Sequence, residues 1–116
     1  MAFRLTVALA FSFAITYFSR EAVAARPHIT VRAGHYNGRL WTAVTNDGSV
    51  KITRMKWVVR FVEGPTGEQR GTIKHVLRPG QTVNFTSDLQ VPPAGQHWRA
   101  DHIILYVYAS GKWIEP

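Results

Sequence analysis

The sequence predicts an all-β protein, a seven-stranded β-sandwich that follows an N-terminal signal peptide. Two observations favour this fold class. After residue 26 the chain consists of short runs rich in Val, Ile, Thr and aromatic residues, separated by Gly, Pro, Asn and Asp, and no run has the spacing of a helix. The number of runs is typical of two packed sheets, because a single open sheet would leave one apolar face in water. A small β-barrel is the alternative.

The N-terminal residues have the order of a secretory signal peptide. Arg4 precedes the uncharged, mainly apolar segment Leu5–Phe18, and Ala22–Ala24 supplies small residues at the spacing that a signal peptidase recognises. The apolar segment is shorter than the roughly 20 residues of a membrane-spanning helix. We therefore expect residues 1–25 to be a cleaved signal peptide, with an uncleaved anchor as the competing interpretation. Residues 26–116 then form one domain of a periplasmic or secreted protein.

The first two strands after the signal form a predicted hairpin. The run "HITVRA", residues 28–33, alternates apolar and polar side chains, and "RLWTAVT", residues 39–45, contains the next strand. Between them Asn37-Gly38 indicates a tight turn, because both residues tolerate positive φ. The segment "NDGS" then turns the chain again.

The longest predicted strand, Val50–Val62, contains a change of phase. Its apolar residues lie first at even and then at odd positions: Val50 and Ile52, then Met55, Trp57, Val59 and Phe61. Side chains alternate between the two faces of a strand, so both sets share one face only if the strand is irregular. We predict a bulge or bend at Thr53-Arg54. Beyond it, Lys56 and Arg60 should face solvent.

Four further strands complete the predicted sandwich: Thr72–Leu77, Thr82–Ser87, Ala100–Ala109 and Lys112–Glu115. The first of them should place Ile73, His75 and Leu77 on one face. The strand Ala100–Ala109, "ADHIILYVYA", is almost continuously apolar, which is typical of a central strand with both faces covered.

Three stretches carry a resemblance to a known family. They are "LWTAVTNDGSVKITRMKWVVRF", "VLRPGQTVNF" and a late apolar strand that ends in Gly-x-Trp. Together they resemble the small immunoglobulin-like or fibronectin-type domains of bacterial envelope proteins, over most of residues 27–116. The shared motifs are short turn sequences, and no catalytic residues belong to them. The resemblance implies a binding or accessory module, whose function must be argued from its own site.

The charge of the chain bears on its partners. The formal net charge is +7, and it falls to +6 without the signal residues Arg4, Arg20 and Glu21. An exported basic protein meets anionic lipid head groups, acidic polysaccharide or acidic proteins. We therefore expect an envelope protein or another anionic envelope component as the partner, with no nucleic acid and no membrane span after signal cleavage. Charge that serves solubility alone is the alternative.

The residues predict no catalytic chemistry. No Gly-x-Ser-x-Gly elbow surrounds a serine, and the chain has no cysteine. His97 and His102, with Asp101 between them, come nearest to a metal-ligand pattern, but their spacing does not define a set of three or four converging ligands. We expect no metal, no cofactor and no enzyme, and a small hydrolase remains an alternative.

Two groups of residues are candidates for binding. Arg54, Lys56 and Arg60 form a basic stripe on the solvent face of the long strand, which could steer an acidic partner. The leading hypothesis is a non-enzymatic, exported β-sandwich protein of the cell envelope that binds another protein, and edge strands of such sheets can add a partner strand.

The second group lies after a Pro-rich loop. Trp98 stands beside Arg99, and an exposed Trp next to Arg is typical of an interface anchor. With Tyr36 and nearby arginines it would serve an alternative function, carbohydrate or glycolipid binding, if the rings are exposed and coplanar. A Trp98 that plugs one end of the sandwich is the competing interpretation.

Overall fold

The computed structural model of the protein describes residues 27–116. The predicted signal peptide, residues 1–25, lies outside the described residues. Within the described part of the chain, no helix is long and apolar enough to cross a membrane.

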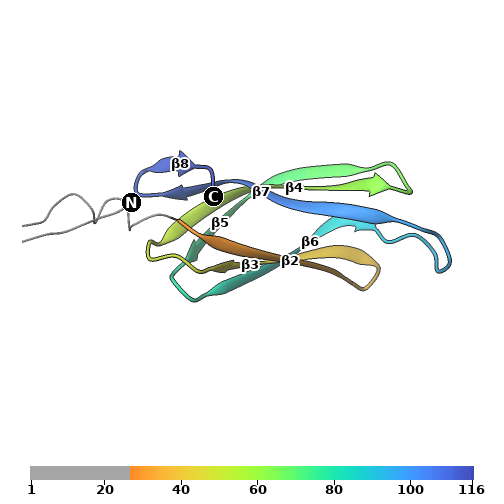
Figure 1. The fold of residues 1–116 in the computed structure, drawn as a ribbon, viewed down its shortest axis with the longest axis horizontal. Coiled ribbons are helices and arrows are strands. Elements are labelled where there is room, and N and C mark those ends of the chain that lie inside the picture. Colours follow the sequence, from red (N-terminus) through yellow and green to blue (C-terminus); the bar gives the residue numbers. More distant parts are fainter. Residues whose placement is uncertain (1–26) are drawn as a thin grey trace, which may run out of the picture.

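Residues 27–116 form two antiparallel β-sheets and contain no helix. The strands are β2 (Ile29–Tyr36), β3 (Arg39–Asn46), β4 (Ile52–Glu63), β5 (Glu68–Leu77), β6 (Thr82–Gln90), β7 (Arg99–Ala109) and β8 (Lys112–Ile114). One sheet has the order β2-β3-β6 and the other β5-β4-β7-β8 (Figure 1). The prediction of a seven-stranded all-β sandwich is confirmed, and the barrel alternative is wrong because neither sheet closes on itself.

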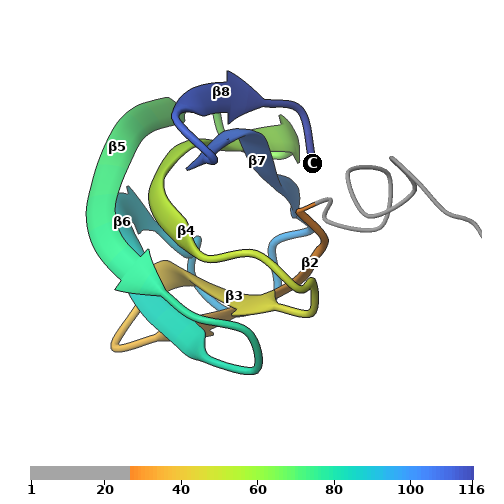
Figure 2. The same ribbon diagram turned by 90° about the vertical axis from the view of Figure 1, so that its left-hand side faces the viewer.

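The chain changes sheet three times, between β3 and β4, between β5 and β6, and between β6 and β7. The two sheets therefore face one another across a shared core, as the end-on view in Figure 2 shows. On one side of the sandwich β5 lies close to β6, and on the other side β2 lies close to β7. This arrangement decides which strand edges remain open.

Tight turns with positive φ join the hairpins. Asn37 and Gly38 have φ values of 51° and 76°, which confirms the turn predicted between β2 and β3. Ser110 and Gly111, with φ of 54° and 78°, make the same kind of turn between β7 and β8. Left-handed backbone at the first residue of each pair is tolerated by the short polar side chains of Asn and Ser.

The inner face of β4 has the predicted composition. Met55, Trp57 and Val59 are buried and Phe61 is partly buried, whereas Lys56 and Arg60 are exposed. The Trp57 ring packs against Phe85 of the opposite sheet, with ring centroids 5.0 Å apart. Its indole also lies over Gly71 of β5, where any Cβ would come within 2.7 Å of the ring. Trp57 thus joins both sheets at the centre of the core.

The change of phase predicted in β4 is present, and the ladder with β5 shows how it is accommodated. Ile52 and Met55 are both fully buried, so the phase does change between them. In the ladder Ile52 pairs with Leu77 and Arg54 with Lys74, so His75 and Val76 of β5 together oppose Thr53. The register therefore shifts at the predicted position, and the unmatched residue of the ladder lies in β5. His75, which was expected on the inner face with Leu77, lies in this unpaired step of the ladder and is exposed.

β7 is less central than its apolar sequence predicts. It pairs with β4 from Arg99 to Tyr108, but β8 pairs with it only at Val107–Ala109. Over the rest of its length β7 is an edge strand. Its ladder with β4 also shifts, since Lys56 opposes Tyr106 and Trp57 opposes Ile104, which leaves Leu105 as an extra residue.

Candidate binding face

The outer face of the four-stranded sheet brings basic and aromatic side chains together. Directly opposed residues of antiparallel strands share a face. One row across the sheet is therefore Lys74 of β5, Arg54 of β4, Tyr108 of β7 and Trp113 of β8. In the adjacent row Lys56 opposes Tyr106. We call this surface the aromatic–basic face: Arg54, Lys56, Lys74, Tyr106, Tyr108 and Trp113.

Two cations of the aromatic–basic face lie over aromatic rings. The Arg54 guanidinium is 5.0 Å from the centre of the Tyr108 ring, and the Lys56 ammonium is 4.7 Å from that of Trp113. Tyr108 and Trp113 themselves meet edge to face, with centroids 5.2 Å apart and planes at 74°. Ring contact of this kind orients a cation without neutralising it. The charges of Arg54 and Lys56 therefore remain available to an anion.

The other end of the same outer face is electrically balanced. Asp101 lies 3.9 Å from Arg60 and also 3.9 Å from Arg99. Glu63 accepts hydrogen bonds from His97 at 2.5 Å and from Arg99 at 3.2 Å. These contacts, the one with His97 first, hold the pKa of Glu63 below its usual range. Arg60 therefore belongs to this charge network, although the sequence grouped it with Arg54 and Lys56.

The charged side chains of residues 27–116 are distributed unequally between the two ends of the sandwich. Four arginines form ion pairs with carboxylates: Arg39, Arg60, Arg70 and Arg99. The opposite end carries the turns at residues 46–51, 78–81 and 110–111. The basic side chains near it form no ion pair with any carboxylate of residues 27–116: Lys51, Arg54, Lys56, Lys74, Arg78 and Lys112. Asp47 and Glu115 are the acids near these turns. We call this the basic end.

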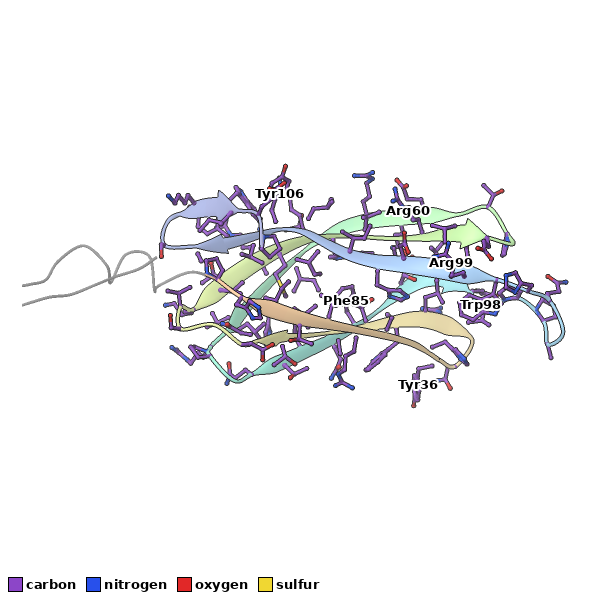
Figure 3. All side chains as sticks on the ribbon, viewed as in Figure 1. Tyr36, Arg60, Phe85, Trp98, Arg99 and Tyr106 are labelled. Atoms are coloured by element: carbon purple, nitrogen blue, oxygen red, sulfur yellow. The ribbon has the colours of Figure 1, made fainter. Side chains whose placement is uncertain are left out.

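The second predicted group, Trp98 and Arg99, does not form an exposed anchor. Trp98 is partly buried and packs against the core, with its ring edge to face with Phe61 at 6.0 Å and near His35 at 6.1 Å. Arg99 is held by Glu63 and Asp101. Figure 3 shows Trp98 between the two sheets at the end opposite to the basic end. This is the plugging role that was the competing interpretation.

Tyr36 does not join Trp98 in a platform. His35 points toward Trp98, so its neighbour Tyr36 projects from the opposite face of β2. Tyr36 is 65% exposed and points away from the sandwich (Figure 3). The coplanar, exposed pair of rings that the carbohydrate alternative requires is not formed by these residues.

One polar pair crosses the interior. His102 of β7 faces inward, and its Nδ1 lies 2.7 Å from Oγ1 of Thr42 on β3. Burial holds the pKa of His102 below its usual range, while the charge of Asp101 opposes this effect. Among residues 27–116, no group of three His, Asp or Glu side chains converges on a possible metal site.

Sequence reasoning found Arg54 and Lys56 but missed their aromatic neighbours. Tyr106 and Tyr108 alternate along β7, and this alternation is the signal that would have placed them on one face. Their alignment with Arg54 and Lys56 depends on the shift at Leu105 and on the pairing of β8 with β7. The strand Lys112–Glu115 was predicted, but no sequence pattern predicts the shift at Leu105 or the register of β8.

Comparison with models of protein families, with curated proteins and with solved structures gave no significant match.

Proposed function

We propose that this chain is an exported, non-enzymatic binding module of the cell envelope that recognises an acidic surface of a partner protein through its aromatic–basic face. One observation carries the proposal: Arg54 and Lys56 lie over the rings of Tyr108 and Trp113 on an exposed sheet face, without a carboxylate beside them among residues 27–116. Export rests on the order of residues in the N-terminal segment.

We further propose that the domain is of the immunoglobulin-like or fibronectin type. The support is the interleaving of strands between a three-stranded and a four-stranded sheet, which is the connectivity of Greek-key sandwiches. Domains of this architecture serve many functions, so the assignment supports a binding module only in general terms.

The chemistry of the face favours a protein over other anions. Aromatic residues and Arg are enriched at the centres of protein interfaces, which is the composition of this face. A sugar platform needs a ring that lies flat and open, whereas Tyr108 and Trp113 meet at 74° and partly cover each other. Tyr106 is 41% exposed and stands beside Lys56, so it supplies the open part of the contact.

The test is cross-linking in cells that express the full chain. A photoreactive amino acid in place of Tyr106 should yield a defined adduct with an envelope protein. Arg54→Glu should reduce the adduct by about tenfold, since it places a like charge against the acidic partner. Raising the salt concentration in a membrane-free extract should weaken the contact in the same direction.

Arg32→Glu is the matched control. Arg32 also lies over an indole, 6.0 Å from the Trp41 ring, but it belongs to the outer face of the three-stranded sheet. The adduct should survive this substitution. Equal loss with Arg32→Glu and Arg54→Glu would mean that net charge alone matters, and adducts with lipid or polysaccharide alone would replace the protein partner with that component.

A further inference from the structure

The four-stranded sheet is incomplete along one edge. β8 pairs with β7 only at Val107–Ala109, whereas the preceding residues of β7, Arg99–Tyr106, have β4 on one side and no strand of residues 27–116 on the other. Within residues 27–116, no backbone hydrogen bond from outside the β4 ladder reaches this segment. Its outward N–H and C=O groups therefore form a free row, which is a template for another strand.

The opposite sheet has exposed inner residues where this strand is missing. Thr42 of β3 contacts His102 of β7, so β2, which is the neighbour of β3, faces the position beside β7. Ile29 and Val31, at the first half of β2, are partly buried and pack against the core. Farther along β2, Ala33 and His35 are exposed.

Ala33 and His35 nevertheless belong to the inner face. They oppose Thr42 and Leu40 of β3, which are both buried, and opposed residues share a face. In a sandwich with complete sheets, inner residues of an edge strand are covered by the strand across from them. The exposure of this pair therefore marks the place that a continuation of β8 would cover.

We infer that the Arg99–Tyr106 edge accepts an extended segment of a partner protein, which adds to the sheet in line with β8 and places alternate apolar side chains over Ala33 and His35. A peptide backbone is the ligand that supplies donors and acceptors at the spacing of this edge. The inner side chains of this edge are Ala100, His102 and Ile104. His102 already bonds Thr42 of the opposite sheet, so the apolar Ala100 and Ile104 favour apolar residues at alternate positions of the added segment.

A second copy of this chain fits the edge less well. In another folded copy, alternate side chains of each strand already point into that copy's own interior. They cannot also cover Ala33 and His35 here. The occupant is therefore a segment that is free to become extended. This edge is distinct from the aromatic–basic face, so either surface can fail its test while the other passes.

The test uses a library of random dodecapeptides displayed on phage, selected on the immobilised full chain. The enriched peptides should alternate apolar and polar residues. A synthetic copy of one of them, added to the ¹⁵N-labelled chain, should shift and protect the amides of Arg99–Tyr106. Arg54→Glu should change its affinity by less than about twofold, which separates this site from the aromatic–basic face.

Ala33→Lys and Ala33→Glu test the inner contact. Either charge would be buried beneath the added strand without a partner, so both should weaken peptide binding by about tenfold or more. Tyr36→Lys, on the other face of the same strand, is the control and should change the affinity by less than about twofold. Thermal melts establish that the variants fold.

Three outcomes would overturn the inference. One is the absence of any enriched peptide. Another is binding whose amide shifts map to β2, β5 or β6 and not to Arg99–Tyr106. The third is a full chain that sediments as a dimer with these amides protected before any peptide is added, since the occupant would then be a second copy.

Discussion

Trp57 is the residue on which most of the packing depends. It is 8% exposed, touches Phe85 of the opposite sheet and lies over Gly71 of the neighbouring strand. The chain has no cysteine and therefore no disulfide, so packing of this kind must hold the two layers of a small sandwich together.

We predict that Trp57→Ala lowers the free energy of unfolding by about 3–5 kcal/mol, as large aromatic truncations in cores do. A loss of this size approaches the whole stability of a small domain, roughly 5 kcal/mol at the lower limit. The variant should be largely unfolded in thermal melts. Lys56→Ala and Arg60→Ala, at exposed positions of the same strand, should change stability by no more than about 0.5 kcal/mol. The reverse result would mean that the two faces of β4 are exchanged.

His102 gives the fold a dependence on pH. Burial lowers its pKa in the folded state below the ordinary value of 6.5, so the unfolded chain binds the proton more readily. His102 therefore does not lower the free energy of unfolding at pH values above its ordinary pKa. It costs increasing stability as the pH falls from that value to the lower, folded-state pKa.

The measurement is the melting temperature of the full chain between about pH 7.5 and pH 5. The melting temperature of the parent should fall more on acidification than that of His102→Gln, because the glutamine amide stays neutral and can still bond Thr42. Glu63 and the other titrating groups are common to both proteins, so their effects cancel in the comparison. Parallel pH profiles for parent and variant would exclude His102 as a source of the dependence.

At the scale of elements, Asn46 connects three strand ends. Its buried side chain donates to the carbonyls of Val50 and Leu77, both at 2.8 Å, and accepts from the amide of Gly48 at 3.0 Å. It thereby fixes the end of β3 to the turn before β4 and to the end of β5.

We predict that Asn46→Ala destabilises the domain by about 2–4 kcal/mol, because it leaves buried carbonyl groups without donors. Hydrogen exchange should accelerate first at the amides of residues 46–51 and 77–81. Asn84→Ala, at an exposed position of β6, is the matched control and should be nearly neutral. If exchange rises uniformly over the domain, the effect of Asn46 is global and not a local connection of these turns.

The strands themselves were predictable from local patterns. The alternation in β2 and β3 and the Asn37-Gly38 turn depend on residues adjacent in the chain, and so does the change of phase in β4. Which strand of the pair carries the unmatched residue was not predictable, because this depends on the register between β4 and β5, which no local pattern contains.

The candidate site was predictable only in part, for a related reason. Arg54 and Lys56 lie on one strand, so their common face follows from the two-residue period. Arg60 has the same parity, yet Asp101 of β7 neutralises it, and that pairing depends on the register between strands. Trp98 was ambiguous because its exposure is set by Phe61 and His35, which are distant in sequence.

At the scale of the whole molecule, the two open sides of the sandwich are covered to different extents. β5 and β6 lie close together on one side, whereas on the other β2 faces a sheet edge that β8 covers at one end only. Both layers are complete only near the basic end, where β8 pairs with β7, and we expect the fold to be most stable there. The segment Arg99–Tyr106 and the inner residues Ala33 and His35 form the less protected half.

The unequal distribution of charge gives the folded domain a permanent electric dipole along its strands. Ion pairs neutralise the end around Glu63 and Asp101, while Arg54, Lys56 and Arg78 lie at the basic end and find no carboxylate partner among residues 27–116. A negatively charged surface exerts a torque on such a molecule before any contact forms. The torque acts over a distance of about 10 Å at 0.1 M salt and shortens as salt is added. In dilute buffer the domain therefore approaches a negatively charged surface with its basic end first more often than random collision would give.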